Sequence, residues 1–188
     1  MSEQLYNKKS KEDLVKLLQD EPFKRLTLSF YKYLSISNPT EIRDILYSDF
    51  LEMKILGRVY IATEGINAQI SIPEHNENKF LRNINASAIL ENLEIKRAVQ
   101  DGVSFYKLTI KVKNEIVAYN LDNKEYDMEF VGQHLDPIEF NRAIENPNSI
   151  VVDIRNHYES EVGHFEGAVI PDVDRSQELL PEIKKLLM

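Results

Sequence analysis

The spacing of the apolar side chains changes several times along residues 1–113, and these changes predict an order of strands and helices. Residues 26–33 alternate between apolar and polar side chains, which is the pattern of a strand with one buried face. Residues 39–53 instead place their apolar side chains on one stripe of a helix. The same reading predicts helices at 11–19 and from about 74, and strands at 55–62, 66–72, 94–99 and 105–112.

Two local signals mark the ends of these elements. The run Asn38-Pro39-Thr40-Glu41 is typical of a helix start, with Asn38 as the cap and Glu41 reaching back to it. Glu64-Gly65 predicts a tight turn between two strands, because glycine permits turn conformations that other residues resist. The resulting β-α-β-β-α-β order is that of the ferredoxin-like fold, an antiparallel sheet with both helices on one face.

Successive side chains alternate across a strand, so the sequence also separates the two faces of this sheet. The face for the helices is apolar: Leu26, Leu28, Phe30, Val59, Ile61, Ile66, Ile70, Ile72, Leu108, Ile110 and Val112. The other face carries rings, amides and cations: Thr27, Ser29, Tyr31, Tyr33, Arg58, Tyr60, Asn67, Gln69, Ser71, Lys107, Lys111 and Lys113.

That second face resembles an open sheet of the kind that binds single-stranded RNA, where rings stack on bases and cations meet phosphates. The candidate RNA-binding residues are Tyr31, Tyr33, Arg58, Tyr60, Lys107, Lys111 and Lys113. In the alternative interpretation, the second domain or a dimer partner covers this face and the tyrosines are packing residues. Acylphosphatases share the fold but need an arginine in a glycine-rich loop after the first strand, and Leu34-Ser35-Ile36-Ser37 offers neither residue.

Composition limits the other functions. The net charge of −8 argues against a nonspecific nucleic-acid binder, yet residues 114–188 hold 16 acidic and 6 basic side chains whereas residues 1–113 hold 15 and 17. The absence of cysteine excludes disulfides and thiol catalysis within these residues. The four histidines are too scattered to indicate a metal site, and no metal is expected. No apolar run could span a membrane and no signal peptide is visible, so a cytoplasmic location is expected.

The second part of the chain predicts a parallel β-α-β unit. Residues 114–136 indicate an acidic linker, and a helix is predicted from about Pro137 to Glu145. The run 150–152 is typical of a strand buried on both faces, and 168–170 of a second strand. Between them, Asn156 is expected to cap a short helix over 158–162, and Gly163 to end it with a positive φ.

Asp153 and Arg155 follow the first of these strands, where open α/β sheets place their sites. The guanidinium of Arg155 could hold an anion or an adjacent carboxylate through two hydrogen bonds, and Asp153 is expected to cap backbone amides or to pair with it. In the alternative interpretation, Asp153, Arg155 and His164 only pin loops through hydrogen bonds and an ion pair.

Three stretches carry a family resemblance: FYKYLSISNPTEIRDILY, GRVYIATEGINAQISIP and VVDIRNHYESEVGHFEGAVIPD. Together they resemble the rhodanese-containing tRNA uridine 5-hydroxylases of bacteria, from about Leu26 to the end of the chain. This resemblance implies an α/β (α+β) chain with a ferredoxin-like domain at 1–113, a linker at 114–136 and the first part of a rhodanese-like parallel α/β domain at 137–188. One departure follows Asp174, where the Thr-Phe-Arg-like run of the family is replaced by Arg175.

The resemblance also implies an activity, the hydroxylation of the wobble uridine of tRNA to 5-hydroxyuridine with molecular oxygen as co-substrate. The essential cysteine of the family would lie beyond Met188, so no catalytic residue is expected in the chain itself. Asp153 and Arg155 would shape the loop of that cysteine. An unfinished sheet with an open edge at Val151 and Val152 is expected to self-associate, or to show rapid amide exchange from Ile150 onward while Leu26 to Val112 stays protected. The alternatives are a rhodanese-type sulfurtransferase and a noncatalytic RNA-binding or docking module.

Overall fold

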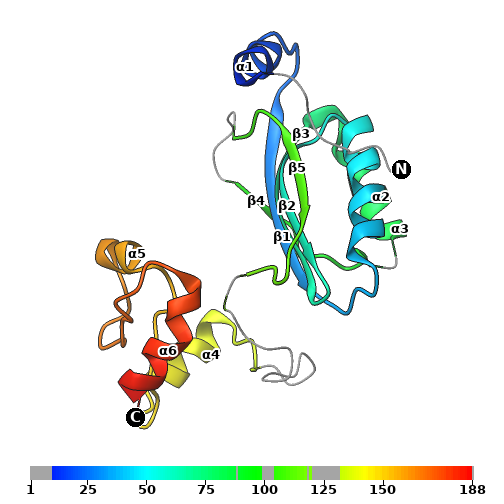
Figure 1. Cartoon of the computed structure of the whole chain (residues 1–188). Coiled ribbons are helices and arrows are strands. Elements are labelled where there is room, and N and C mark those ends of the chain that lie inside the picture. Colours follow the sequence, from blue (N-terminus) through cyan, green and yellow to red (C-terminus); the bar gives the residue numbers. More distant parts are fainter. Residues whose placement is uncertain (1–9, 88, 99–103, 118, 120–131, 188) are drawn as a thin grey trace. The chain divides into compact units, whose positions relative to one another are not determined.

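The chain forms two compact units, Met1–Ile116 and Val117–Met188. The computed structural model describes residues 10–87, 89–98, 104–117, 119 and 132–187 (Figure 1). Four acidic side chains of the predicted linker lie outside the described residues: Asp122, Glu125, Asp127 and Glu129.

The elements of the first unit follow the predicted order. Its helices are α1 (Lys11–Gln19), α2 (Pro39–Glu52) and α3 (Glu77–Ala86), the last preceded by the short 3₁₀ helix η1 (Glu74–Asn76). Its strands are β1 (Arg25–Tyr33), β2 (Leu56–Ala62), β3 (Gly65–Pro73), β4 (Lys96–Arg97) and β5 (Leu108–Val112). β4 and β5 are shorter than the strands predicted at 94–99 and 105–112, whereas β1, β2 and β3 match their predictions to within one residue.

The strands form one sheet in the order β4-β1-β3-β2-β5, with α2 and α3 on the same side of it (Figure 1). β1, β2, β3 and β4 pair antiparallel, whereas β5 runs parallel to β2. The prediction of a purely antiparallel sheet was therefore wrong for β5. The chain crosses from the β4 edge to the opposite edge, and a crossover of this kind, unlike a tight hairpin, permits parallel pairing.

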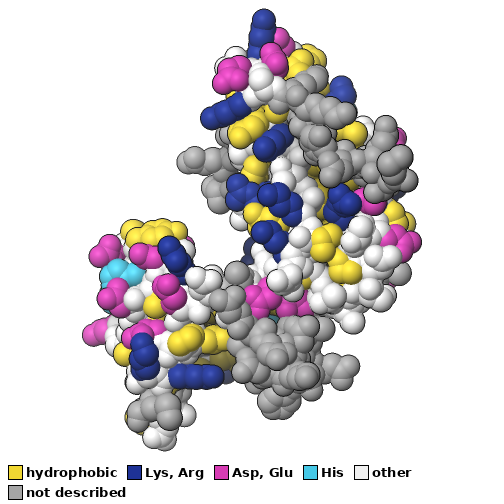
Figure 2. All heavy atoms as spheres, in the orientation of Figure 1, with side chains coloured by type: hydrophobic (Ala, Val, Ile, Leu, Met, Phe, Trp, Pro, Cys, Tyr) yellow, Lys and Arg dark blue, Asp and Glu magenta, His cyan; other side chains and the backbone are white. Residues whose placement is uncertain are grey.

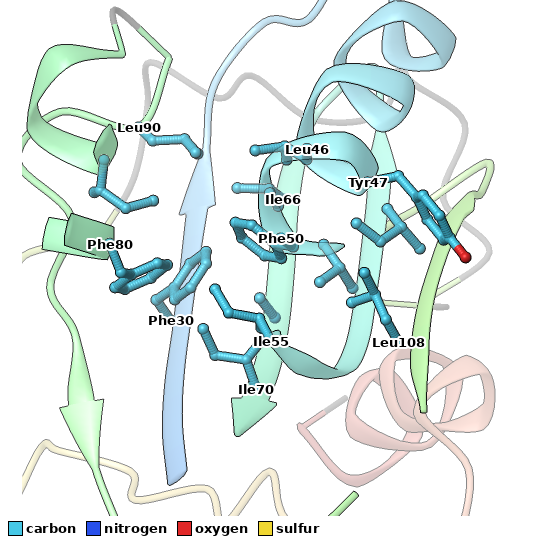
Figure 3. Packing of buried hydrophobic residues seen from close by; sticks show 14 of the residues in the cluster. Phe30, Leu46, Tyr47, Phe50, Ile55, Ile66, Ile70, Phe80, Leu90 and Leu108 are labelled. Atoms are coloured by element: carbon cyan, nitrogen blue, oxygen red, sulfur yellow. The ribbon is translucent and has the colours of Figure 1, made fainter. Parts of the chain in front are cut away.

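The core lies between the sheet and the two helices, as the alternation of side chains predicted. Phe50 of α2 and Phe80 of α3 meet with ring centroids 5.9 Å apart in an edge-on contact, and Phe30 of β1 lies 6.3 Å from Phe80 (Figure 3). The predicted apolar face is buried except at its margins, where Leu26 is half-buried and Val112 is 43% exposed. Val112 is the last residue of an edge strand, which explains its exposure.

Both predicted end signals are present, with some differences. The side chain of Asn38 accepts a hydrogen bond from the backbone N–H of Glu41 at 3.3 Å, while the Glu41 carboxylate accepts from the side-chain amide of Asn38. Gly65 does not form the turn itself but opens β3, with φ +151°. A Cβ there would lie 2.2 Å from the carbonyl oxygen of Lys32, so the close approach of β1 also requires glycine.

Arg25 is a buried cation that no sequence pattern singled out. Its guanidinium donates to both carboxylate oxygens of Glu21, at 2.6 and 2.7 Å. It also donates to the carbonyl oxygens of Lys54 and Ser71, each at 3.0 Å. The side chain therefore ties the segment before β1 to the start of β2 and to β3.

The second unit contains α4 (Pro137–Ile144), α5 (His157–Val162) and α6 (Ser176–Leu187), of which α6 was not predicted. The two predicted strands are reduced to one parallel bridge, between Val152 and Val169. The expected burial on both faces was wrong, because Ile150 is 65% exposed and Val152 only half-buried. A parallel strand is buried only where layers cover both of its faces, and the described residues do not cover this one.

Gly163 also differs from its prediction. Its φ of 168° is ordinary extended backbone, so α5 does not end in a left-handed glycine. The carbonyl oxygen of Gly163 instead accepts a hydrogen bond from the Arg155 side chain at 2.6 Å. The left-handed glycine of this region is Gly167, with φ +74°.

Candidate functional site

The second face of the sheet brings polar side chains into two rows that cross the strands. In one row Tyr31 of β1 and Tyr60 of β2 flank Asn67 of β3, and Lys111 of β5 follows Tyr60. The other row runs through five strands in the order Lys96, Ser29, Gln69, Arg58 and Thr109. These nine residues are called the polar band below.

The polar band is basic within an acidic chain. Arg58, Lys96 and Lys111 are exposed, and none of its nine residues is acidic. Figure 2 shows Lys and Arg side chains gathered over the strands of the first unit. The chain as a whole carries −8, so the sheet concentrates positive charge locally.

Aromatic rings lie among these cations. The ring of Tyr31 is 55% exposed and meets the ring of Tyr33 edge-on, with centroids 6.4 Å apart. The ammonium group of Lys113 lies 5.6 Å from the ring centroid of the half-buried Tyr60. The face therefore combines exposed rings with cations, as the sequence predicted.

The two ends of this face are closed. At one end Ser71 is fully buried, and the hydroxyls of Thr27 and Ser104 share a hydrogen bond of 2.8 Å. At the other end the buried Ile116 donates its N–H to the Glu64 carboxylate at 2.8 Å, and its carbonyl oxygen accepts from the Asn67 side chain at 3.4 Å. The expected open surface is therefore narrower than the sequence predicted, and Ser71 does not belong to it.

The structure groups some of the predicted RNA-binding residues and separates others. Four of them lie in the polar band: Tyr31, Arg58, Tyr60 and Lys111. Tyr33 ends β1, while Lys107 and Lys113 flank β5 just outside its ends. Sequence reasoning missed Lys96 and Thr109 as part of the face, although their positions within the predicted strands were a usable signal.

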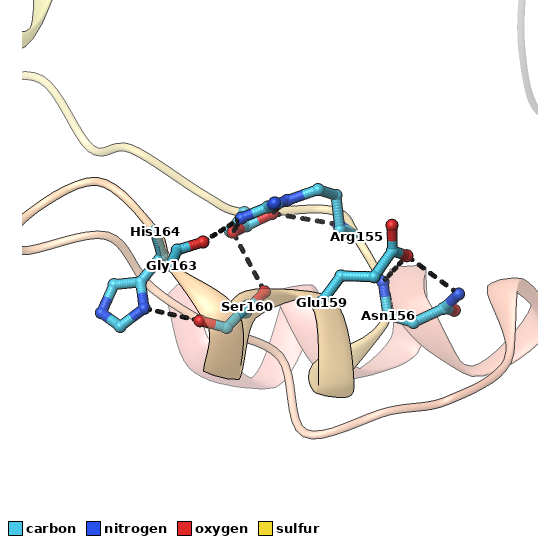
Figure 4. A network of polar contacts seen from close by, with 7 residues as sticks. Arg155, Asn156, Glu159, Ser160, Gly163 and His164 are labelled. Carbon is cyan, nitrogen blue, oxygen red and sulfur yellow. Dashed lines mark hydrogen bonds and ion pairs between the residues drawn. The ribbon is translucent and has the colours of Figure 1, made fainter. Parts of the chain in front are cut away.

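A second polar cluster surrounds Arg155 in the second unit (Figure 4). Arg155 donates through Nε to Oδ1 of Asp153 at 2.9 Å and through Nη2 to Oδ2 at 2.6 Å. The Ser160 hydroxyl donates to Asp153 at 3.0 Å, and the imidazole of His164 contacts the Ser160 carbonyl at 2.9 Å. The sequence predicted either an anion or an adjacent carboxylate as the partner of Arg155. The structure shows the carboxylate of Asp153.

This pairing fixes the charges of both residues. Hydrogen bonds from the Arg155 side chain hold the pKa of Asp153 well below its usual value, and the same contact raises the pKa of Arg155. Both residues line an open pocket of about 660 Å³ whose wall also includes Phe140, Ile150 and Phe165. The cluster can hold the loop after Val152 in one conformation beside this pocket, which also agrees with the alternative in which these residues only pin loops.

The Asp153 pKa predicts a pH dependence for the second unit. A carboxyl group whose pKa is lower in the folded state contributes stability above its unfolded pKa of about 3.9, and loses it as the pH falls toward the folded pKa. We expect the thermal midpoint of the second unit, followed by its NMR signals, to fall between about pH 5 and pH 2. Asp153→Asn should lower the midpoint at pH 7 and flatten this dependence, whereas Asp174→Asn, at an exposed carboxylate, should do neither. Equal pH profiles for wild type and Asp153→Asn would contradict this role.

The described residues show neither a metal cluster nor a membrane helix. Among them, no group of three or more His, Cys, Asp and Glu side chains is placed to hold a metal ion. None of their helices has both the length and the apolar composition needed to cross a membrane.

Comparison with known proteins first defines the class of the first unit. Residues 25–116 match the family described as "UPF0176 acylphosphatase like domain". This match agrees with the ferredoxin-like arrangement of the sheet and helices. Among solved structures, the dark state of the BLUF protein BlrB aligns with a TM-score of 0.38 and 13% identity, over 48% of this chain and 72% of that chain.

Sequence relatives extend the similarity to nearly the whole chain. Over 97% of its length the chain is 48% identical to a "tRNA uridine(34) hydroxylase" of Leptospira interrogans, of which it covers 50%. It is 41% identical to the protein of that name from Photorhabdus laumondii and 40% identical to one from Escherichia coli, in each case over 97% of this chain and 53% of the relative. The chain is therefore similar, over nearly its whole length, to proteins named tRNA uridine(34) hydroxylase. It spans about half the length of the curated relatives it matches.

Proposed function

We propose that this chain acts in tRNA modification, in the oxygen-dependent hydroxylation of the wobble uridine to 5-hydroxyuridine. The observation that carries the proposal is the 48% identity, over 97% of the chain, to a relative named tRNA uridine(34) hydroxylase. Molecular oxygen is the proposed co-substrate, since a hydroxylase requires an oxidant. tRNA is the proposed partner and the cytoplasm the proposed location.

We further propose that the two parts of the chain have different roles. Residues 1–113 would dock tRNA through the sheet, with Tyr31, Tyr33, Arg58, Tyr60, Lys107, Lys111 and Lys113 as the contacting residues. Residues 137–188 would be a rhodanese-like unit in which Asp153 and Arg155 position the loop of a reactive cysteine. The parallel bridge between Val152 and Val169 and the Asp153–Arg155 pair support this assignment.

Deleting the gene tests the function whatever the length of its product. Nucleosides from total tRNA of wild-type, deleted and complemented cells would be measured by liquid chromatography and mass spectrometry. We expect 5-hydroxyuridine and its derivatives to disappear on deletion and to return on complementation. Loss of thiolated nucleosides instead would favour sulfur transfer, and an unchanged nucleoside profile would overturn the proposal in favour of a noncatalytic role.

The isolated 188-residue chain tests whether its own side chains can carry sulfur. Rhodanese-type transfer from thiosulfate requires a cysteine thiolate, and this sequence has no cysteine. We expect no thiocyanate to form when the purified chain is incubated with thiosulfate and cyanide. Turnover by a sample whose mass matches these residues would mean that another group carries the sulfur.

A further inference from the structure

We propose that the polar band is a binding site for unpaired nucleotides of a tRNA loop, with bases stacked on Tyr31 and Tyr60. The inference rests on the proposed function, because that function supplies tRNA as the ligand. The inference goes beyond the proposed function because it names the part of the tRNA that is bound and the side chains that select this part.

The charge of the polar band favours a polyanion. Arg58, Lys96 and Lys111 are exposed on it, and none of its nine residues carries a carboxylate that would neutralise them. The polar band therefore has a positive charge, whereas the 31 acidic side chains of the whole chain outnumber its 23 basic ones. Phosphate groups bound there would release counterions, which is the main source of affinity for nucleic acids.

The uncharged side chains favour unpaired nucleotides over a duplex. In a duplex the bases are stacked on each other, so exposed rings gain little from it. A base freed from its stack can lie on the Tyr31 ring, which is 55% exposed. The exposed side-chain amide of Gln69 lies between the rings and cations and has the donor and acceptor groups that a free base edge requires. The half-buried Asn67 amide already donates to the Ile116 carbonyl, so less of it is available to a base.

The geometry of the sheet predicts the direction in which a bound RNA strand crosses the β-strands. Tyr31 and Tyr60 both pair with Asn67, from opposite sides, so they lie two strand spacings apart, about 10 Å. The other row has Lys96 on the edge strand β4 and Arg58 beside the opposite edge strand β5. Cations therefore lie toward both edges of the sheet, with the rings between them.

The closed ends of the face support the same direction. Ser71 is fully buried at one end of the strands, and Ile116, bound to Glu64 and Asn67, closes the other. A polynucleotide that lay along the strands would meet these contacts. One that crosses them, from β4 toward β5, follows the open surface.

The test compares two RNAs by fluorescence anisotropy with the 188-residue chain. One is a hairpin with a seven-nucleotide loop, the other a blunt duplex of the same nucleotide count. We expect the hairpin to bind about tenfold more tightly or better, and Tyr31→Ala to weaken hairpin binding by about 5- to 100-fold, as for the loss of one stacked base. Tyr31→Phe should retain binding because it keeps the ring. Tyr158→Ala, at an exposed tyrosine of the second unit, should have no effect.

A matched pair of arginines separates a local site from overall charge. Arg58 lies in the polar band, and Arg82 is exposed on α3, which packs on the opposite face of the sheet. We expect Arg58→Glu to weaken hairpin binding about tenfold or more and Arg82→Glu to leave it nearly unchanged. Equal affinity for hairpin and duplex, equal effects of the two arginine variants, or no binding at all would overturn the inference.

The outcome is distinct from that of the proposed function. If deletion of the gene removes 5-hydroxyuridine but the hairpin does not bind through the polar band, this inference fails and the function stands. If the hairpin binds as expected and the nucleosides do not change, the function fails and the band remains an RNA-binding site.

Discussion

Replacing Phe50 with alanine is expected to lower the free energy of unfolding of the first unit by about 3–5 kcal/mol. The Phe50 side chain is 1% exposed and packs against Phe80 at the centre of the core, so its removal leaves a cavity between the helices and the sheet. Urea denaturation of the variant and the wild type would measure the difference.

The neighbouring residue is a matched control for this change. Leu51 lies on the same helix but is 59% exposed, and Leu51→Ala should change the free energy of unfolding by no more than about 0.5 kcal/mol. Similar losses for the two variants would mean that the core is not centred on the contact between α2 and α3.

The double change Lys111→Glu with Lys113→Glu is expected to weaken tRNA binding by about 10- to 100-fold. It removes two cations that could contact phosphates and places two negative charges beside Tyr60. Lys111 is the strand partner of Tyr60, and the ammonium group of Lys113 lies over the Tyr60 ring. The slope of log affinity against log salt should become shallower by about two, one for each lost contact. Filter binding at several salt concentrations measures both quantities.

The same pair of changes in α6 serves as the control. Lys184→Glu with Lys185→Glu alters the net charge identically in the second unit, and affinity and slope should stay near those of the wild type. Wild-type affinity and slope in the Lys111 and Lys113 variant would instead mean that this face is covered by protein, the alternative open from the sequence.

The two faces of the first sheet could be predicted because alternation along a strand does not depend on distant contacts. Once residues 26–33 and 66–72 are strands, the side of Tyr31 and of Asn67 follows. The same alternation could have assigned Lys96 and Thr109 to this face, but the order of residues across the sheet depends on how β4 and β5 pair with their neighbours. That pairing, including the parallel direction of β5, is set by the crossover between sheet edges, which leaves no periodic signal.

Other features depended on neighbours that local sequence does not describe. The β-branched run at 150–152 has strand propensity, but its burial requires layers on both faces, and Ile150 is exposed. Gly163 follows a short helix, as a cap glycine would. Its carbonyl oxygen, however, accepts a hydrogen bond from the Arg155 side chain, and its backbone is extended. The net charge pointed away from nucleic acids because it averages an acidic second part with a polar band that holds three cations and no carboxylate.

The most direct test of RNA binding at the sheet maps the contact residue by residue. The ¹⁵N-labelled chain would be titrated with the hairpin that has a seven-nucleotide loop, and the amide shifts would be followed by NMR. We expect the largest shifts in the polar band, at Tyr31, Arg58, Tyr60, Asn67, Gln69 and Lys111, and little change in α2 and α3. Shifts confined to the helices or to the second unit would contradict RNA binding at this face.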